Sequence, residues 1–269
     1  MSGAYVHGYD PLESTRLQDQ AETLVDLLHS DIAYPDGSSV LEAGCGVGAQ
    51  TVPLARNSPG ARITSVDVSS DSLAEAERRT IAAGLAGVRF RQADIFALPF
   101  EPASFDHLFV CFVLEHLADP VEALRRLGRL LRPGGTVTVI EGDHGSTYFH
   151  PDSEAAHRAI RCQVALQAAA GGDALIGRRL YPLLRDAGYD AVRVSPRLVY
   201  VDGSRPALAE GFTRRTFTAM IEGVRARAIE AGMTGPDAFD DGVRDLRRTA
   251  EPDGVFCYTF FKAVGRRAA

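Results

Sequence analysis

The chain has 269 residues, with 29 lysines and arginines against 35 aspartates and glutamates, which gives a formal net charge of −6. This acidic balance lacks the positive patch that a nucleic-acid partner requires. No apolar run approaches the roughly 18 residues of a membrane span, and the first residues do not read as a secretory leader. We therefore expect a soluble, cytoplasmic protein with neither nucleic acid nor a membrane as partner.

The cysteines indicate neither a disulfide framework nor a metal site. The four of them are Cys45, Cys111, Cys162 and Cys257. They lie far apart in sequence and form no C-x-x-C pair, so we expect free thiols and no metal ligands.

The first half of the chain alternates β-prone runs with helical stretches. The five predicted strands are residues 38–43, 62–67, 88–93, 105–112 and 136–141. Ser70 or Asp71 can cap one intervening helix that Gly84 ends, and Asp119 followed by Pro120 can start another. Pro133-Gly134-Gly135 is expected to stop the second helix. This alternation predicts an α/β fold with a doubly wound, Rossmann-like parallel sheet.

After residue 141 the pattern predicts helices at 153–170 and 175–187, with Gly188 as terminator, and a sixth strand at 191–201. A helical insertion at 206–250 precedes a last β-prone run at 254–265. We expect one domain over 1–269. Its core would comprise about 35–143, 173–202 and 253–266, and a helical cap would be built from 1–34, 144–172 and 203–252.

The most specific local pattern runs from Val40 to Thr51, where an apolar strand ends in Gly44, Gly46 and Gly48 before a helix. Glycines permit positive φ and a close approach of backbone to ligand, and free N–H groups at a helix start attract an anionic group. With Ala49 the run also satisfies the dinucleotide pattern G-x-G-x-x-[G/A]. The turn by itself therefore does not decide whether the cofactor is a dinucleotide or belongs to another class.

Acidic residues beside this turn help to separate the two classes. Glu42 stands two residues before the first glycine, where a cationic ligand is favoured over a dinucleotide. Asp67 ends the second strand and can accept both hydroxyls of an adenosine ribose, which either cofactor contains. Asp94 and Ile95 end the third strand and can bond the amino group and the ring of adenine.

Together with Leu131-Arg132-Pro133-Gly134-Gly135, these motifs over about residues 38–141 resemble the class I S-adenosylmethionine (SAM) dependent methyltransferases. The resemblance implies a seven-stranded sheet whose last strand is antiparallel and inserted between strands five and six. It also implies SAM as the cofactor. The residues expected to bind it are Glu42, Gly44, Gly46, Gly48, Gln50, Thr51, Asp67, Val68, Asp94, Ile95 and Cys111.

The stretch 105–117 resembles the fourth-strand region of the small-molecule branch that includes quinone-biosynthesis methyltransferases. That resemblance implies that Glu115 and His116 approach the transferred methyl group. The paired-acid loop of protein-arginine methyltransferases and the Asn/Asp-Pro-Pro-aromatic loop of DNA amino-methyltransferases are both missing from this stretch. The acceptor is therefore expected to be a small molecule.

A looser resemblance, at His7-Gly8-Tyr9, at 141–145 and at 256–261, is to actinobacterial indole methyltransferases of secondary metabolism. These methylate carbon 3 of tryptophan-derived substrates and trigger pyrroloindoline ring closure. The resemblance implies that Glu115 or His116, relayed through Tyr9 or His144, withdraws the indole N–H proton.

Other interpretations remain open at this stage. The acceptor could be a phenolic, quinol or carboxylate oxygen, or another carbon. The chain could also be an NAD-dependent oxidoreductase or a SAM-binding protein without catalysis. Glu115 could be an ordinary helix-start acid, His116 a satisfied core histidine, and His144 a turn histidine bonded to backbone. The sequence leaves the oligomeric state undetermined, a homodimer included.

Overall fold

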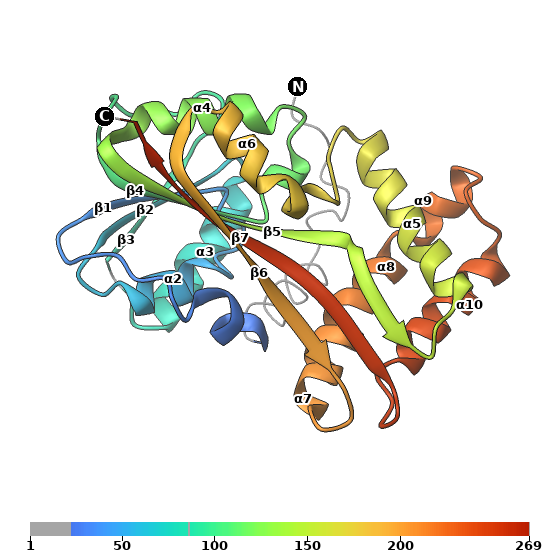
Figure 1. The fold of residues 1–269 in the computed structure, drawn as a ribbon. Coiled ribbons are helices and arrows are strands. Elements are labelled where there is room, and N and C mark those ends of the chain that lie inside the picture. Colours follow the sequence, from blue (N-terminus) through green and yellow to red (C-terminus); the bar gives the residue numbers. More distant parts are fainter. Residues whose placement is uncertain (1–22, 86, 269) are drawn as a thin grey trace. The chain divides into compact units, whose positions relative to one another are not determined.

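A computed structural model describes residues 23–85 and 87–268, and Tyr9 lies outside them. The strands form a seven-stranded sheet in the order β3-β2-β1-β4-β5-β7-β6 (Figure 1). The last strand, β7, is antiparallel and lies between β5 and β6, as the sequence predicted. The fold is therefore the doubly wound α/β sheet that the strand–helix alternation indicated.

The strands begin and end close to the predicted positions in the first half of the chain. They are β1 (Ser39–Ala43), β2 (Arg62–Asp67), β3 (Val88–Gln92), β4 (Phe105–Cys111), β5 (Leu131–His150), β6 (Tyr189–Val201) and β7 (Val255–Arg267). The first five run parallel, β1 beside β2 and β4, β2 beside β3, and β4 beside β5. Their carboxyl ends therefore lie along one edge of the sheet.

The helices are α2 (Thr51–Asn57), α3 (Ser70–Ala82), η1 (Leu114–His116), α4 (Pro120–Leu130), α5 (Glu154–Ala169), η2 (Ile176–Arg179), α6 (Leu180–Asp186), α7 (Pro206–Leu208), η3 (Ala209–Thr218), α8 (Ala219–Gly223), α9 (Arg225–Glu230) and α10 (Pro236–Arg248). Helices α3 and α4 begin and end close to the predicted capping and terminating residues. The cap of α3 is one residue earlier than predicted, because Ser69 rather than Ser70 or Asp71 accepts the backbone N–H of Ser72.

Helix α4 forms where its capping residues predict it. The Asp119 side chain accepts the backbone N–H of Glu122 at 2.9 Å, and Pro120 occupies the first helical position. Leu124 and Leu127, one turn apart, are fully buried and fix this helix on the sheet.

Strand β5 is much longer than the predicted 136–141. Pro133-Gly134-Gly135 does not leave the strand but forms an irregularity in its pairing with β4, where Gly134 has a φ of +75°. At its other end the strand continues through His144 to His150, so the expectation that His144 follows the strand in a turn is wrong. The physical reason is non-local, because β5 lies beside β7, whose residues are more than a hundred positions away.

The chain divides into two compact units, which are described separately. The second unit holds Leu28–Glu141, Gly177–Pro196 and 261–268. Within it, α2 and α3 pack together, as do α4 and α6, and Figure 1 shows the two pairs on opposite faces of the sheet. This layering buries most residues of β1 and β4, which explains the apolar character of these two strands.

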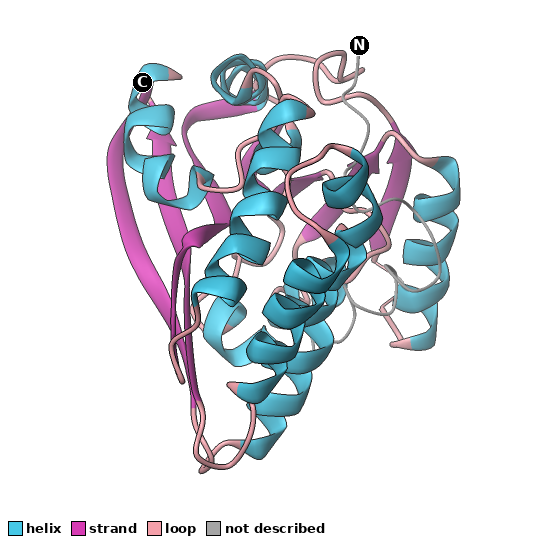
Figure 2. Cartoon of the chain, turned by 90° about the vertical axis from the view of Figure 1, so that its right-hand side faces the viewer, coloured by secondary structure: helices cyan, strands magenta, loops and turns pink. Residues whose placement is uncertain are grey.

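The first unit holds the described residues 23–27, Gly142–Ile176 and Arg197–Phe260. Its helices face the viewer in Figure 2, and α5 and α10 pack closely along each other. Gly242 permits this contact, because a Cβ there would lie 2.5 Å from the carbonyl oxygen of Ala155. In the described part of the chain, none of the helices combines the length and apolar character needed to cross a membrane. The expected division into a cap and a core stays a prediction.

Candidate functional site

The predicted cofactor residues of the second unit gather at the carboxyl edge of its parallel strands. The glycine loop follows β1, Asp67 ends β2, Cys111 ends β4, and Glu141 lies in β5 just beyond Ile140, the partner of Cys111. Ligands of open α/β sheets bind at this edge, where the strand order reverses beside the first strand. The order β2-β1-β4 places that reversal next to the glycine loop.

The backbone conformation requires glycine at all three motif positions, and at two of them a side chain would also collide with neighbouring atoms. Gly44, Gly46 and Gly48 have φ values of +78°, +51° and +78°, a region that other residues rarely adopt. A Cβ on Gly44 would lie 2.5 Å from a methyl group of Val113, and one on Gly48 would lie 2.8 Å from Cα of Ala76. At Gly46 the same position meets nothing within 4 Å, so the loop leaves open space there.

Four backbone N–H groups of this loop donate to acceptors within the protein, whereas the expectation that N–H groups at the helix start attract an anionic group stays a prediction. Gly44 and Cys45 donate to the carbonyl oxygen of Val66 at 2.8 and 3.0 Å, and Gly48 donates to that of Cys45. Gly46 donates to Asp67 Oδ2 at 2.8 Å. Because a dinucleotide needs such groups for its pyrophosphate, this geometry argues against an NAD site.

Asp67 is held in place by the backbone on both sides of its carboxylate. Oδ2 accepts the N–H of Gly46, and Oδ1 accepts the N–H of Ser69 at 2.9 Å. A carboxylate oxygen has more than one acceptor position, so each can still accept a hydroxyl group. The side chain is half-buried and remains available to bind a ribose diol.

Glu42 is a buried carboxyl group, exposed by only 2%. Its Oε2 accepts hydroxyl groups from Ser65, its neighbour on β2, at 2.6 Å and from Thr51 at 2.7 Å. Burial raises the pKa of Glu42 to about 7, against the lowering effect of these two hydrogen bonds, and the charge of Asp67 adds to the rise. The group is therefore poised to lose its proton when a cation binds nearby.

Replacing Glu42 with glutamine should change how the stability of the protein depends on pH. The folded protein keeps a proton on Glu42 that the unfolded chain releases near its ordinary pKa of 4.5. The stabilisation is therefore complete below about pH 4.5 and is lost as the pH rises through 7. Relative to wild type, Glu42→Gln should gain on the order of 2–3 kcal/mol in free energy of unfolding between pH 5 and pH 8.

Urea unfolding of both proteins at the two pH values measures this difference, and titrations common to both proteins cancel. Glutamine retains an acceptor oxygen for Ser65 and Thr51, so folding is expected. An equal difference at pH 5 and pH 8 would show that Glu42 ionises like an exposed glutamate.

Gln50 and Thr51 direct their side chains into the protein. Gln50 Oε1 lies 2.6 Å from Nε2 of His29, and the Thr51 hydroxyl donates to Glu42. Both residues are buried. A part for them in cofactor binding stays a prediction, and these contacts favour support of the loop and of Glu42.

The other predicted cofactor residues differ in exposure. Val68 is exposed beyond β2, and Asp94 is exposed beyond β3 and accepts the backbone N–H of Phe96 at 2.8 Å. Ile95 and Cys111 are buried. Burial raises the pKa of the Cys111 thiol, and the charges of neighbouring carboxyl groups raise it further. A buried thiol with a raised pKa carries little of the nucleophilic thiolate at neutral pH.

Glu141, for which the sequence patterns predict no role, lies in β5 at this edge. The side chain is fully buried. Its Oε1 accepts the backbone N–H groups of Val113 and Leu114 at 3.0 and 2.7 Å, while Oε2 has no hydrogen-bond partner among the described residues. Burial, and then the charge of Glu115, raise the pKa of Glu141 well above its usual range. An acid at the end of the apolar run Val137–Ile140 was the signal that could have identified it.

Glu141 thereby fixes the short helix η1, which carries Glu115 and His116. The two side chains are mostly buried, exposed by 12% and 23%, and Nε2 of His116 lies 3.7 Å from Oε1 of Glu115. Two carboxyl groups and an imidazole thus lie in one small region of the second unit. Such a group of side chains can accept a proton from a bound compound.

His144 belongs to the first unit and is buried. Its Nδ1 lies 2.8 Å from Oη of Tyr258, and its backbone N–H donates to the carbonyl oxygen of Ala174 at 2.9 Å. The role predicted for it is untested, and the role predicted for Tyr9 falls on residues that the structure does not describe.

The fold and this edge are those of an α/β domain whose strand-end acids would suit a nucleoside cofactor. Residues 41–139 match the family described as Methyltransferase domain. The matched segment is therefore similar to the class I SAM-dependent methyltransferases, whose cofactor is SAM. The site fits this cofactor, since the loop is open at Gly46, Asp67 suits its ribose, and buried carboxyl groups suit its cationic groups.

Two sequence relatives show how much of the chain is similar to other proteins. An uncharacterized 37.1 kDa protein in transposon TN4556 of Streptomyces fradiae is 34% identical over 215 residues, which cover 79% of this chain and 61% of that protein. The ubiquinone biosynthesis O-methyltransferase of Paracidovorax citrulli is 37% identical over 107 residues, 39% of this chain and 44% of that enzyme. The chain thus spans less than two thirds of the length of these relatives.

Among solved structures, phosphoethanolamine N-methyltransferase 2 of Haemonchus contortus has a TM-score of 0.58 and 20% identity. The match covers 92% of this chain and 53% of that chain, which was crystallised with phosphomonomethylethanolamine and S-adenosylhomocysteine. At this identity the likeness establishes the fold.

Proposed function

We propose that the chain is a SAM-dependent methyltransferase that acts on a small molecule. The observation that carries the proposal is the loop Gly44–Gly48 tied to Asp67. The amides of Gly44, Cys45, Gly46 and Gly48 donate to protein acceptors. The space at Gly46 is open, and buried carboxyl groups flank the loop. This arrangement suits a ribose and positive charge rather than a pyrophosphate. When bound, SAM supplies an electrophilic methyl group.

The chain's own residues have two tasks in this function. Glu42, Asp67 and the glycine loop bind the cofactor, with Asp94 and Ile95 at its adenine. Fixing the reactants at near-attack distance can lower a barrier by roughly 7–11 kcal/mol, so a strong acid or base is not always required. Glu115 and His116 then serve as proton acceptors for the compound that is methylated.

For the acceptor, we propose an indole that is methylated at carbon 3, with pyrroloindoline closure in a tryptophan-derived substrate. Removal of the indole N–H proton by Glu115 or His116 would raise the electron density at carbon 3. A phenol or quinol oxygen is the second candidate, favoured by the similarity to a ubiquinone biosynthesis O-methyltransferase. In that case the same residues would accept the hydroxyl proton.

Mass spectrometry of reactions that contain SAM and a panel of tryptophan cyclodipeptides, simple indoles, phenols and quinols tests this proposal. A gain of one methyl group with loss of indole absorbance supports carbon-3 methylation. A gain on phenols or quinols alone contradicts the indole acceptor and keeps the methyltransferase. A failure to methylate any of the panel contradicts both acceptor classes and favours a protein that binds SAM without catalysis.

A further inference from the structure

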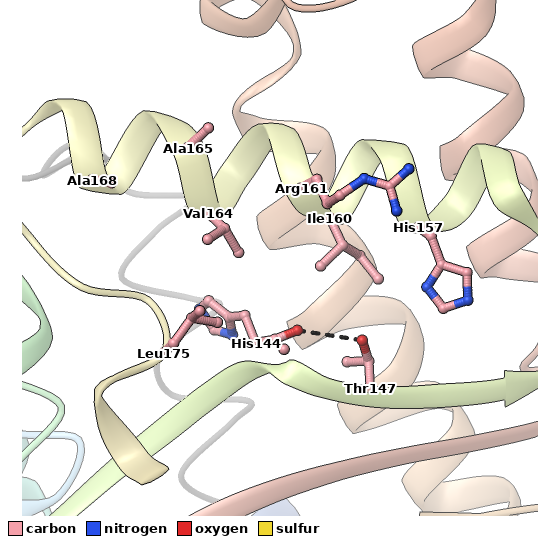
Figure 3. A pocket seen from close by; sticks show the side chains of 10 residues that line it. His144, Thr147, His157, Ile160, Arg161, Val164, Ala165, Ala168 and Leu175 are labelled. Atoms are coloured by element: carbon pink, nitrogen blue, oxygen red, sulfur yellow. Dashed lines mark hydrogen bonds between the residues drawn. The ribbon is translucent and has the colours of Figure 1, made fainter. Parts of the chain in front are cut away.

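The first unit contains a cavity of about 550 Å³ whose described lining comes only from residues of 144–175. Figure 3 shows it between helix α5 and strand β5, with side chains from the two elements pointing toward each other. Pockets of this size bind small molecules, mainly through apolar walls and a few polar groups. The chemistry of the lining therefore indicates what the cavity can hold.

The helix side of the cavity is apolar toward the C-terminal end of α5, whereas His157 and Arg161 line it toward the start of the helix. Ile160, Val164, Ala165 and Ala168 line it from α5, and Leu175 closes one end. None of these side chains can donate or accept a hydrogen bond. A compound held against this wall gains by removing apolar surface from water.

The strand side supplies a polar group in a fixed orientation. The imidazole of His144 is held by Tyr258, its ring lies edge-on to Phe217 at 6.1 Å, and Thr147 donates to its backbone carbonyl oxygen. Gly142 makes room for this arrangement, because a Cβ there would lie 2.2 Å from the Tyr258 hydroxyl. Among the described residues, His144 thus provides a hydrogen-bonding side chain in a fixed orientation opposite the apolar part of α5.

The cationic groups at the other end are balanced by acids. Arg161 forms an ion pair with Glu154, and Nε2 of His157 lies 2.9 Å from Asp152. The ring of His157 also stacks on Phe149, with centroids 4.7 Å apart. No uncompensated charge among these residues selects an ionic ligand.

We propose that this cavity binds an uncharged, largely apolar ring compound through its α5 wall, with one polar group of the compound at His144. The walls of one helix and one strand favour a flat molecule such as an indole or a naphthol. As the acceptor class of the enzyme this inference rests on the proposed function, whereas binding itself can be measured without SAM.

The chain contains no tryptophan, so the fluorescence of an added indole reports binding without background from the protein. We expect the anisotropy of indole, excited where tyrosine does not absorb, to rise and saturate as wild-type protein is added. Indole-3-acetate and tryptamine should bind at least about tenfold more weakly, because each would bring an uncompensated charge into an apolar space.

Two neighbouring alanines provide matched variants. Ala168 lines the cavity, whereas Ala169 on the same exposed stretch of α5 does not. Ala168→Phe should fill the cavity and weaken indole binding at least about tenfold, and Ala169→Phe should bind as wild type does. Equal binding by the two variants, or no saturable binding of indole or 2-naphthol by wild type, would overturn the proposal.

The test of the cavity does not depend on whether the proposed methyltransferase function is correct. Calorimetric titration with SAM should be unaffected in Ala168→Phe. If indole binds and Ala168→Phe abolishes binding while wild type does not bind SAM, the cavity assignment stands and the methyltransferase proposal fails. If SAM binds and indole does not, the cavity assignment alone fails.

Discussion

Replacing Asp67 with alanine should weaken SAM binding by about a hundredfold. A hydrogen bond to a charged group contributes about 1.5–3 kcal/mol, and Asp67 is expected to accept two ribose hydroxyls. Since about 1.4 kcal/mol corresponds to a tenfold change in affinity, two such bonds account for at least this loss. The variant also removes the acceptor of the Gly46 N–H, which weakens the attachment of the glycine loop to the end of β2.

Isothermal titration calorimetry with SAM measures this effect. Asp71→Ala is the matched control, since Asp71 is an exposed aspartate in the first turn of α3. Asp67→Asn should lie between wild type and Asp67→Ala, because the amide retains one acceptor oxygen. An unchanged affinity in a folded Asp67→Ala protein would rule out the ribose assignment.

Removing the proton acceptors on η1 should have the largest effect on turnover. General base catalysis contributes about 10²–10⁴ in rate, and Glu115→Gln or His116→Ala removes a group that can provide it. We expect turnover to fall in this range while the affinity for SAM stays within a few-fold of wild type. Steady-state rates on the acceptor found in the panel, with SAM titrations alongside, separate the two quantities.

Glu101→Gln is the control, because Glu101 is exposed and lies in the loop before β4. The pH profile adds a second criterion, since loss of a base should remove the limb of the profile that the base controls. If turnover is unchanged in both Glu115→Gln and His116→Ala, neither residue takes part in the reaction.

The fold could be predicted well where local signals decide it. Strand ends in the first half of the chain are marked by a glycine or an acid, as at Gly44, which follows β1, and at Asp67, which ends β2. Helix starts are marked by caps, as at Asp119 and Pro120. The position of β7 could be predicted only from the resemblance of the motifs to a known superfamily, because strand order depends on contacts between distant residues.

What the sequence did not reveal depends on such distant contacts. The extension of β5 past Glu141 requires β7, and with it His144 becomes a strand residue held by Tyr258. The occupied amides of the glycine loop depend on the carbonyl oxygen of Val66 and the carboxylate of Asp67. The cavity along α5 has no motif, since small and aliphatic residues on a helix face also pack against ordinary cores.

The edge formed by the glycine loop, Asp67 and Glu42 is expected to bind SAM rather than a dinucleotide. Calorimetric titration of the wild-type protein with SAM, S-adenosylhomocysteine and NADH tests it most directly. We predict saturable binding of SAM and of S-adenosylhomocysteine, one molecule per chain, and no binding of NADH. Saturable binding of NADH without binding of SAM would contradict the account.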